Sequence, residues 1–300
     1  MPATSQRFLP LVLLVATGAM LGISTNMAKL AGEAGVPPLA FLAWSIGGAT
    51  VILLLVAWWR DDLPSLNART LEYFVVAAFV TVAASNLIFF SAVPRVGASF
   101  VALAIAFPPL LTYLGALALR MERFDTLRAG GVALALAGAA VLAVLEFRAP
   151  DASVFWIALT LCGPVLLAIG NLYRTLRWPE GESAEALAPG MLVAASAMLV
   201  AASLIPGFEI AVPGEAAGAV WLIGVQTALF AGQFLLMFSL QKHGGPVLLS
   251  LLGSVGAVVG VPVAILLLGE DAPAGLIYAV PLIAAGIALV TWGGMRKERT

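Results

Sequence analysis

Ten uncharged apolar runs follow one another along the chain, and they limit what it can fold into. The runs span residues 8–28, 34–59, 73–94, 96–119, 129–145, 152–173, 186–208, 216–241, 244–269 and 272–295. A helix crosses the apolar core of a bilayer in about 20 residues. The runs are continuous and do not alternate in period two, which favours helices over barrel strands. We therefore expect an all-α membrane protein with ten transmembrane helices.

The composition excludes a large soluble domain. Hydrophobic residues make up 62% of the 300 residues and charged residues 10%, against roughly 45–50% and about 25% in soluble domains. No soluble chain of this length has an interior that hides so much apolar surface. The net charge of −1 argues against a nucleic-acid partner. The first run is longer than the apolar segment of a signal peptide, so we expect a retained span.

Lysine and arginine gather on one side of the predicted membrane. With a cytoplasmic N-terminus, the outer connections hold only Lys29, Arg95 and Arg148. The inner set is Arg7, Arg60, Arg69, Arg120, Arg123, Arg128, Arg174, Arg177, Lys242, Arg296, Lys297 and Arg299. Because positive residues favour cytoplasmic loops, we expect both termini inside.

The chain also predicts two copies of one unit. The window 86–142 matches the segment 148 residues later at thirteen positions, for example Gly97 with Gly245. A second echo, at an offset of 145 residues, pairs Gly18 with Gly163, Asn26 with Asn171, and Lys29 with Arg174. We therefore divide the chain into residues 1–148 and 149–300. Each part holds five helices, an odd number, so the second must cross the membrane in the opposite sense.

Inverted repeats are a recurring architecture of secondary transporters, with the substrate site near the middle of the membrane. One unit in two conformations gives inward-open and outward-open states of similar energy. We therefore expect transport by alternating access. The alternatives are a duplication that built only a stable membrane scaffold, and a receptor that binds a ligand without moving it.

The residues that an enzyme would need are scarce. The single histidine, His243, lies in an expected loop, and the single cysteine, Cys162, lies inside an apolar run. Neither has neighbours at metal-ligand spacing, and we find no nucleophile–base arrangement or phosphate-binding loop. An intramembrane enzyme would need such groups clustered at one depth. We therefore expect no enzyme, no cofactor and no metal.

The runs themselves carry no charged residue. Coupled pumps usually hold an acidic, histidine or arginine relay within the membrane, whereas Glu72, Glu122, Glu146 and Glu270 fall at expected helix ends. We therefore favour facilitated transport, or coupling through backbone and neutral side chains.

Glu122 and Glu270 occupy equivalent positions in the two units. One interpretation is a gate whose contact differs between the two states. The other is that each residue ends its helix and pairs with Arg120, Arg123 or the backbone, and we favour it because a charge at the interface is cheap to solvate.

Neutral polar and aromatic side chains near mid-span are the expected substrate contacts. In the third run they recur at i, i+7 and i+11, and in the eighth at i, i+4 and i+7, so each set lies on one helical face. An amide that faces lipid is costly, so these faces should point inwards. Ordinary hydrogen bonding between helices would use the same residue types. The expected substrate-binding residues are Trp44, Phe79, Asn86, Phe90, Phe107, Gln226, Phe230 and Gln233.

Proline and glycine predict where the helices bend and pack. Pro108, Pro109 and Pro262 lie inside the fourth and ninth runs, where proline frees a carbonyl and kinks a helix, so we expect hinges there. The fifth and tenth runs are rich in small residues, which let helices approach closely. We expect packing struts or a dimer face at Gly130, Gly131, Gly138, Gly275 and Gly286.

Three segments carry a resemblance to a known family. They are ALALRMERFDTLRAGGVALALAGAAVL, AILLLGEDAPAGLIYAVPLIAAGIALV and SAVPRVGASFVALAIAFPPLLTYLGAL. These segments resemble the drug/metabolite transporter superfamily, in particular the EamA-type ten-helix exporters, which have a Leu-Gly-Glu turn before a glycine-containing last helix. Arg120-Met121-Glu122 replaces the first such turn, and AWSIGG at 43–48 stands where the family often has an arginine.

The resemblance implies a basket in which helices one to four and six to nine surround a cavity, with five and ten outside. It also implies export of small metabolites. Neutral and aromatic amino acids are our first expectation, and drugs or other metabolites of nucleotide or sugar type are the alternative. The expected partners are a small-molecule substrate and the lipid bilayer, for a monomer or homodimer in a bacterial inner membrane.

Overall fold

A computed structural model describes residues 3–85, 88–89, 92, 104, 108–146, 154–268 and 276–297. Every regular element among these residues is helical, and none is a strand. Five segments are long and apolar enough to cross a membrane: Phe8–Glu33, Pro38–Trp59, Val154–Leu176, Ala184–Ala202 and Gly214–Ser250. The prediction of an all-helical membrane protein is confirmed to this extent. The count of ten spans and the inverted repeat stay predictions.

The helices follow the apolar runs closely. The first half holds α1 (Ala3–Glu33), α2 (Pro38–Trp59), α3 (Ala68–Ala78), the π-helical turn η1 (Phe79–Ala83), α6 (Pro108–Ala118) and α7 (Thr126–Glu146). The second half holds α8 (Val154–Leu176), α9 (Ala184–Ala202), the 3₁₀ turn η2 (Gly214–Ala219), α10 (Val220–Ser250), α11 (Leu252–Leu268) and α12 (Leu276–Lys297).

Short polar residues start the helices that follow the hydrophilic connections. The Asn67 side chain accepts hydrogen bonds from the backbone N–H groups of Arg69 and Thr70, and the Thr70 hydroxyl accepts one from the Asn67 N–H. This reciprocal capping box satisfies N–H groups that have no partner inside α3. Ser183 caps α9 in a similar way, since its hydroxyl accepts from the Ala186 N–H at 2.9 Å.

The boundary between the eighth and ninth runs is a single residue, not the loop expected around His243. Helical structure continues through His243, whose Nδ1 lies 2.8 Å from the Ser239 carbonyl oxygen. The break comes at Gly245, with φ +71° and ψ −179°. Only glycine adopts this conformation readily. Pro246 then restarts the helix, and α11 follows directly after Leu251.

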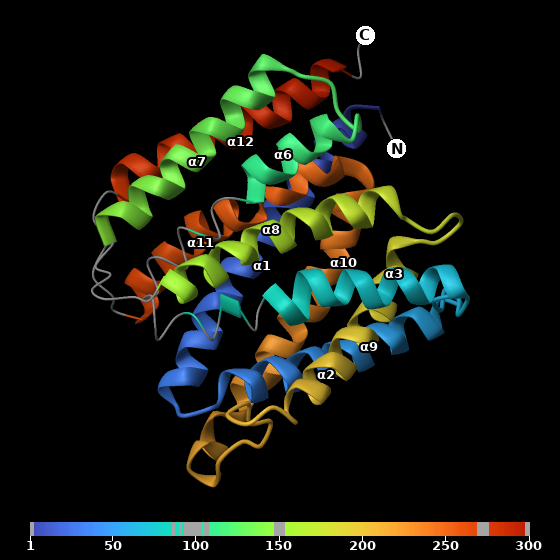
Figure 1. Cartoon of the computed structure of the whole chain (residues 1–300), viewed down its shortest axis with the longest axis vertical. Coiled ribbons are helices and arrows are strands. Elements are labelled where there is room, and N and C mark those ends of the chain that lie inside the picture. Colours follow the sequence, from blue (N-terminus) through green and yellow to red (C-terminus); the bar gives the residue numbers. More distant parts are fainter. Residues whose placement is uncertain are drawn as a thin grey trace.

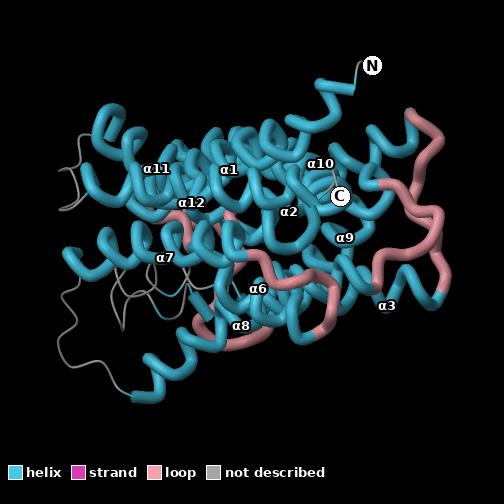
Figure 2. Tube along the Cα trace, turned by 90° about the horizontal axis from the view of Figure 1, so that it is seen from above, coloured by secondary structure: helices cyan, strands magenta, loops and turns pink. Residues whose placement is uncertain are grey.

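Both termini lie at one end of the helix bundle. Figure 1 shows them on the same side as the α2–α3, α6–α7 and α8–α9 connections, while the α1–α2 and α9–η2 connections lie at the other end. Figure 2 shows α1, α10 and α11 along one face of the bundle and α3, α6 and α8 along the other. The connections therefore alternate between the two ends, as the predicted crossings require.

Helix α10 joins the two faces. It packs against α1 and α2 on one side and against α6, α8 and α9 on the other. Helices α9 and α10 supply many of the largest fully buried side chains, among them Leu187, Met191, Leu199 and Phe238.

Helices α7 and α12 pack against each other along one edge of the bundle (Figure 1). Gly131 lies against Gly286, and Gly138 lies against Ala279 and Ile283. Residue numbers rise along one helix as they fall along the other, so the two helices are antiparallel. Any Cβ on Gly131 would lie 2.6 Å from the Gly286 carbonyl oxygen. The close approach expected of the fifth and tenth runs is therefore present, and these two runs pair with each other.

Helices α1 and α11 approach as closely. A Cβ on Gly22 would meet the Gly256 carbonyl oxygen at 2.4 Å and the Gly260 N at 2.7 Å. The Asn26 side-chain amide donates to the Gly22 carbonyl at 2.8 Å and to the Gly260 carbonyl at 2.9 Å. One amide thus ties two backbones together where no water is available to do so.

We predict that Gly131→Ala destabilises the protein and that Gly130→Ala does not. A Cβ at Gly131 meets backbone atoms that cannot yield easily, whereas a Cβ at Gly130 has nothing within 4 Å. The expected cost at Gly131 is about 1–3 kcal/mol, typical of overpacking, and alanine at Gly130 should be neutral or slightly stabilising. Thermal unfolding in detergent measures both. Equal melting temperatures for the two variants would contradict the α7–α12 contact.

Candidate functional site

The polar face predicted on the eighth run points into the bundle. Gln226 and Gln233 on α10 are buried, and Phe230 between them is half-buried with its ring 5.8 Å from that of Phe234. The Ser24 hydroxyl of α1 donates to Gln233 Oε1 at 3.4 Å. Gln226 Oε1 is buried without any hydrogen-bond partner. This face therefore offers an unused acceptor inside the protein.

The other predicted contacts are more scattered. Trp44 on α2 is 56% exposed, and its indole N–H donates to the Ile210 carbonyl at 3.0 Å. Phe79, also exposed, begins η1. Asn86, Phe90 and Phe107 lie outside the described residues. The structure thus brings the α10 residues together on one buried face, whereas Trp44 and Phe79 are exposed.

The π-helical turn η1 widens the third helix where it meets α8. The Ser85 hydroxyl donates to the Val80 carbonyl and the Thr81 hydroxyl to the Ala77 carbonyl. Gly170 of α8 packs directly on Thr81. Such turns are frequent at functional sites in helices, and nothing in the residue pattern of the third run predicted this one.

The prolines have different local roles. Pro108 and Pro109 form the buried first turn of α6, where the missing N–H groups cost nothing. Pro262 lies inside α11, which is helical from Leu252 to Leu268. The hinge role of the three prolines stays a prediction.

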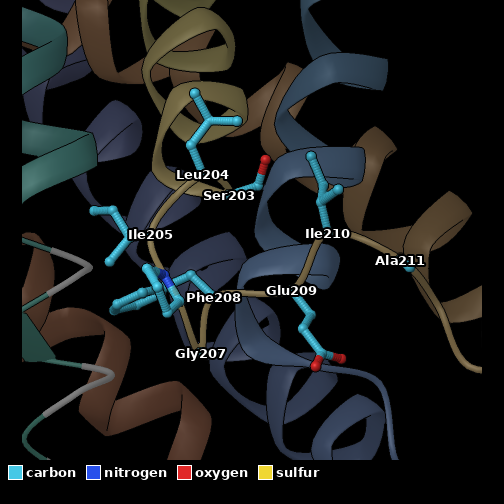
Figure 3. Close-up of a pocket in the computed structure, with 9 residues that line it drawn as sticks. Ser203, Leu204, Ile205, Gly207, Phe208, Glu209, Ile210 and Ala211 are labelled. Carbon is cyan, nitrogen blue, oxygen red and sulfur yellow. The ribbon is translucent and has the colours of Figure 1, made fainter.

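The connection between α9 and η2 encloses a small pocket of its own. Residues 203–211 line an open space of about 330 Å³, and Figure 3 shows the Glu209 carboxylate pointing away from Leu204 and Ile205. The Trp44 indole holds this connection through Ile210. All of its lining comes from one surface connection, so we do not assign the transport path to this pocket.

Glu122 forms an ion pair with Arg128, 2.5 Å between Oε1 and Nη1. Both side chains are largely shielded from solvent. The Asp125 carboxylate caps α7 by accepting from the Arg128 N–H at 2.8 Å, and the Tyr113 hydroxyl bonds to the Asp125 backbone. The partner of Glu122 is therefore Arg128 of the next helix, not only a neighbour in the turn. The equivalent Glu270 lies outside the described residues.

The sequence does not predict the burial of Arg174, because ending the sixth run at residue 173, before the first charge, leaves Arg174 in a connection. In the structure α8 continues to Leu176, and Arg174 is only 2% exposed. The protein interior therefore holds a charged residue near the end of this helix. The spacing of Asn171 and Arg174, three residues apart on one helical face, was the available signal.

Arg174 has few polar contacts. Its Nη2 donates to Asn171 Oδ1 at 2.9 Å, its Nη1 lies 3.7 Å from the Met237 sulfur, and its guanidinium sits 5.9 Å from the centre of the Phe238 ring. Its Nε–H has no partner among the residues that the structure describes. Tyr73 of α3 lies within electrostatic range of the guanidinium, and its buried hydroxyl also has no partner.

Gln241 of α10 completes the group. Its side-chain amide donates to the Asn171 carbonyl at 3.0 Å and to the Thr175 hydroxyl at 2.8 Å, and its Oε1 is buried without a partner. Outside the group, Arg177 pairs with Glu72 at 3.0 Å. The hydrogen bond from Arg177 to Glu72 raises the pKa of Arg177. Glu72 is thus already paired with another arginine.

We predict that Glu122→Gln lowers stability without impairing function. The substitution leaves the shielded Arg128 without its counter-charge, which costs about 1–3 kcal/mol for a pair that retains some contact with solvent. A lower melting temperature with unchanged substrate exchange per folded molecule is expected. Loss of exchange with normal stability would instead support the gate interpretation.

Comparison with known proteins gives a family and a fold. Residues 8–144 match the model of the EamA-like transporter family. The structure of the whole chain is similar to a crystal structure of another protein, with a TM-score of 0.73 and 18% identity over 99% of this chain and 100% of that one. At this identity the likeness shows the fold alone. No curated protein matches the chain.

Proposed function

We propose that the chain is a membrane transporter for small metabolites of the EamA-like transporter family, whose model matches residues 8–144, and that it exports neutral and aromatic amino acids. Substrate would pass between the two halves by alternating access. Drugs or other small metabolites are the alternative cargo within the same family.

The buried amide face of α10 carries this proposal. A buried acceptor without a partner costs about 1–3 kcal/mol, so Gln226 Oε1 is stabilised when a ligand donates an N–H to it. The half-buried Phe230 offers an apolar wall one turn further on. An amino group beside an apolar side chain is the chemistry of a neutral or aromatic amino acid.

Alternating access rests on the proposed inverted repeat, and several contacts support it. With an offset of 148 residues, Gly131 corresponds to Ala279 and Gly286 corresponds to Gly138. The Gly131–Gly286 contact of α7 and α12 therefore corresponds to the Gly138–Ala279 contact. A two-fold axis between the repeats would produce this exchange. The packing of α1 on α11 likewise corresponds to the packing of α8 on α6. The family match also ends at residue 144, close to the proposed boundary at residue 148.

We further propose facilitated transport with both termini in the cytoplasm of a bacterium. Glu72 and Glu122, two of the acids at helix ends, are paired with arginines in the structure, so neither is an isolated proton carrier. The end of the bundle that holds the termini also holds the connections rich in arginine (Figure 1), which favours that end as the cytoplasmic one.

Counterflow in proteoliposomes tests the function. Purified protein is reconstituted with unlabelled amino acid inside, and labelled Phe, Thr or Met is added outside, with and without a pH gradient. We expect exchange of label that is independent of the gradient. Accumulation that depends on the gradient would refute facilitated transport, and absence of exchange with every amino acid would refute this substrate class.

Alanine at Gln226 or Gln233 should reduce exchange about tenfold, the usual loss for one hydrogen bond to substrate. Val225→Ala on the exposed face of α10 is the matched control and should exchange like the unmodified protein. Melting temperatures measured in parallel separate folding from function. Normal exchange by both glutamine variants would show that this face does not line the path.

A further inference from the structure

The burial of Arg174 is not explained by the packing around it. A guanidinium carries several N–H donors and a permanent charge. Here one donor reaches an amide oxygen, one reaches a sulfur, and Nε–H reaches nothing. A buried charge without a counter-charge is strongly destabilising. Stacking on Phe238 offsets only a part of that cost.

At the equivalent position of the first half, the cation is exposed and has a counter-charge. Lys29 follows Asn26 by three residues, as Arg174 follows Asn171. Lys29 is exposed and pairs with Glu33 one turn later at 3.6 Å. The two cations therefore occupy corresponding helix positions but opposite environments. The helix position alone does not force Arg174 into the interior.

No carboxylate of the described residues neutralises Arg174. Glu72, the nearby acid on α3, bonds to Arg177 and receives the Tyr173 hydroxyl at 3.3 Å. The other cation at this end of α10, Lys242, lies over the Trp178 ring at 5.9 Å. The counter-charge of Arg174 must come from outside this part of the chain.

We propose that Arg174, together with the Tyr73 hydroxyl and Gln241, forms a binding site for the carboxylate of the transported substrate at the cytoplasmic end of the path. Arg174 Nε–H and the Tyr73 O–H are two unused donors held by α8 and α3, and they suit a carboxylate, which only accepts. Gln241 Oε1 is an unused acceptor on α10, which suits a substrate ammonium group. A zwitterionic amino acid presents both.

This site is separate from the amide face and lies closer to the proposed cytoplasmic end of α10. Gln241 lies eight residues beyond Gln233, about 12 Å along the helix axis. One amino acid cannot bridge the two. In an exporter the cytoplasmic site is met first, so it would select carboxylates before they reach Gln233 and Gln226. Tyr73 and Phe238 are fully buried here, so α3 must separate from α8 and α10 for substrate to enter.

The inference rests on the proposed function for the identity of the ligand, and binding tests it independently of transport. L-phenylalanine, 3-phenylpropionate and phenethylamine are titrated into the purified protein in nanodiscs, and the change in tryptophan fluorescence is followed. We expect the two carboxylates to bind and the amine to bind about tenfold more weakly, the difference expected for a charge-assisted hydrogen bond.

Four variants locate the binding. Arg174→Gln should weaken carboxylate binding about tenfold or more, and Arg174→Lys should restore part of it because the charge returns without the planar fork. Tyr73→Phe removes only the hydroxyl and keeps the packing, which guards against a folding defect of the arginine variants. Arg177→Gln, at an exposed arginine one turn away, is the matched control and should bind as the unmodified protein does.

The outcomes separate this inference from the proposed function. Arg174-dependent binding of 3-phenylpropionate without any exchange of amino acids would keep the site and refute the amino-acid proposal. Amino-acid exchange that keeps the same KM in Arg174→Gln and Tyr73→Phe would keep the function and refute the site. Equal affinity for phenethylamine and phenylalanine, or no carboxylate binding at all, would also refute it.

Discussion

Close backbone contact between helices is the interaction on which this fold depends. In a bilayer the lipid is as apolar as leucine, so helices are not driven together by removal of apolar surface from water. Their association rests on packing and on hydrogen bonds made inside the protein. Gly22 against Gly260, with Asn26 joining the two carbonyls, holds α1 on α11. Gly131 against Gly286 does the same for α7 and α12.

The same constraint accounts for the polar groups of the interior. Asn26 uses its amide twice and is satisfied, whereas Gln226, Gln241 and Arg174 each keep a buried atom without a partner. Structural polar groups in a membrane protein are expected to be satisfied internally. These three residues lie on α8 and α10, which pack against α1, α2, α3 and α6. In the proposed function, a substrate between these helices would supply the missing bonds.

Much of the fold could be predicted from sequence, because the length of an apolar run and the cost of exposing an amide to lipid depend only on the residues of one segment. The helices, the inward amides Gln226 and Gln233 and the close packing at Gly131 and Gly286 follow from them. The burial of Arg174 could not be predicted, because it depends on how the end of α8 packs against residues of α3 and α10 such as Tyr73 and Met237. The break at Gly245 and the wide turn at Phe79 depend on backbone geometry that the apolar pattern does not record.

The one-residue joint at Gly245 has a mechanical consequence. Helix α10 is continuous for about 22 Å between Gln226 and Gln241, and beyond Gly245 only residues 246–251 separate it from α11. A tilt of this helical segment therefore displaces the amide face and Gln241 together. The same tilt pulls on α11 and, through Asn26, on α1 in the other half. Ligand binding near Arg174 would therefore also displace α11 and α1, because the connection between α10 and α11 is short.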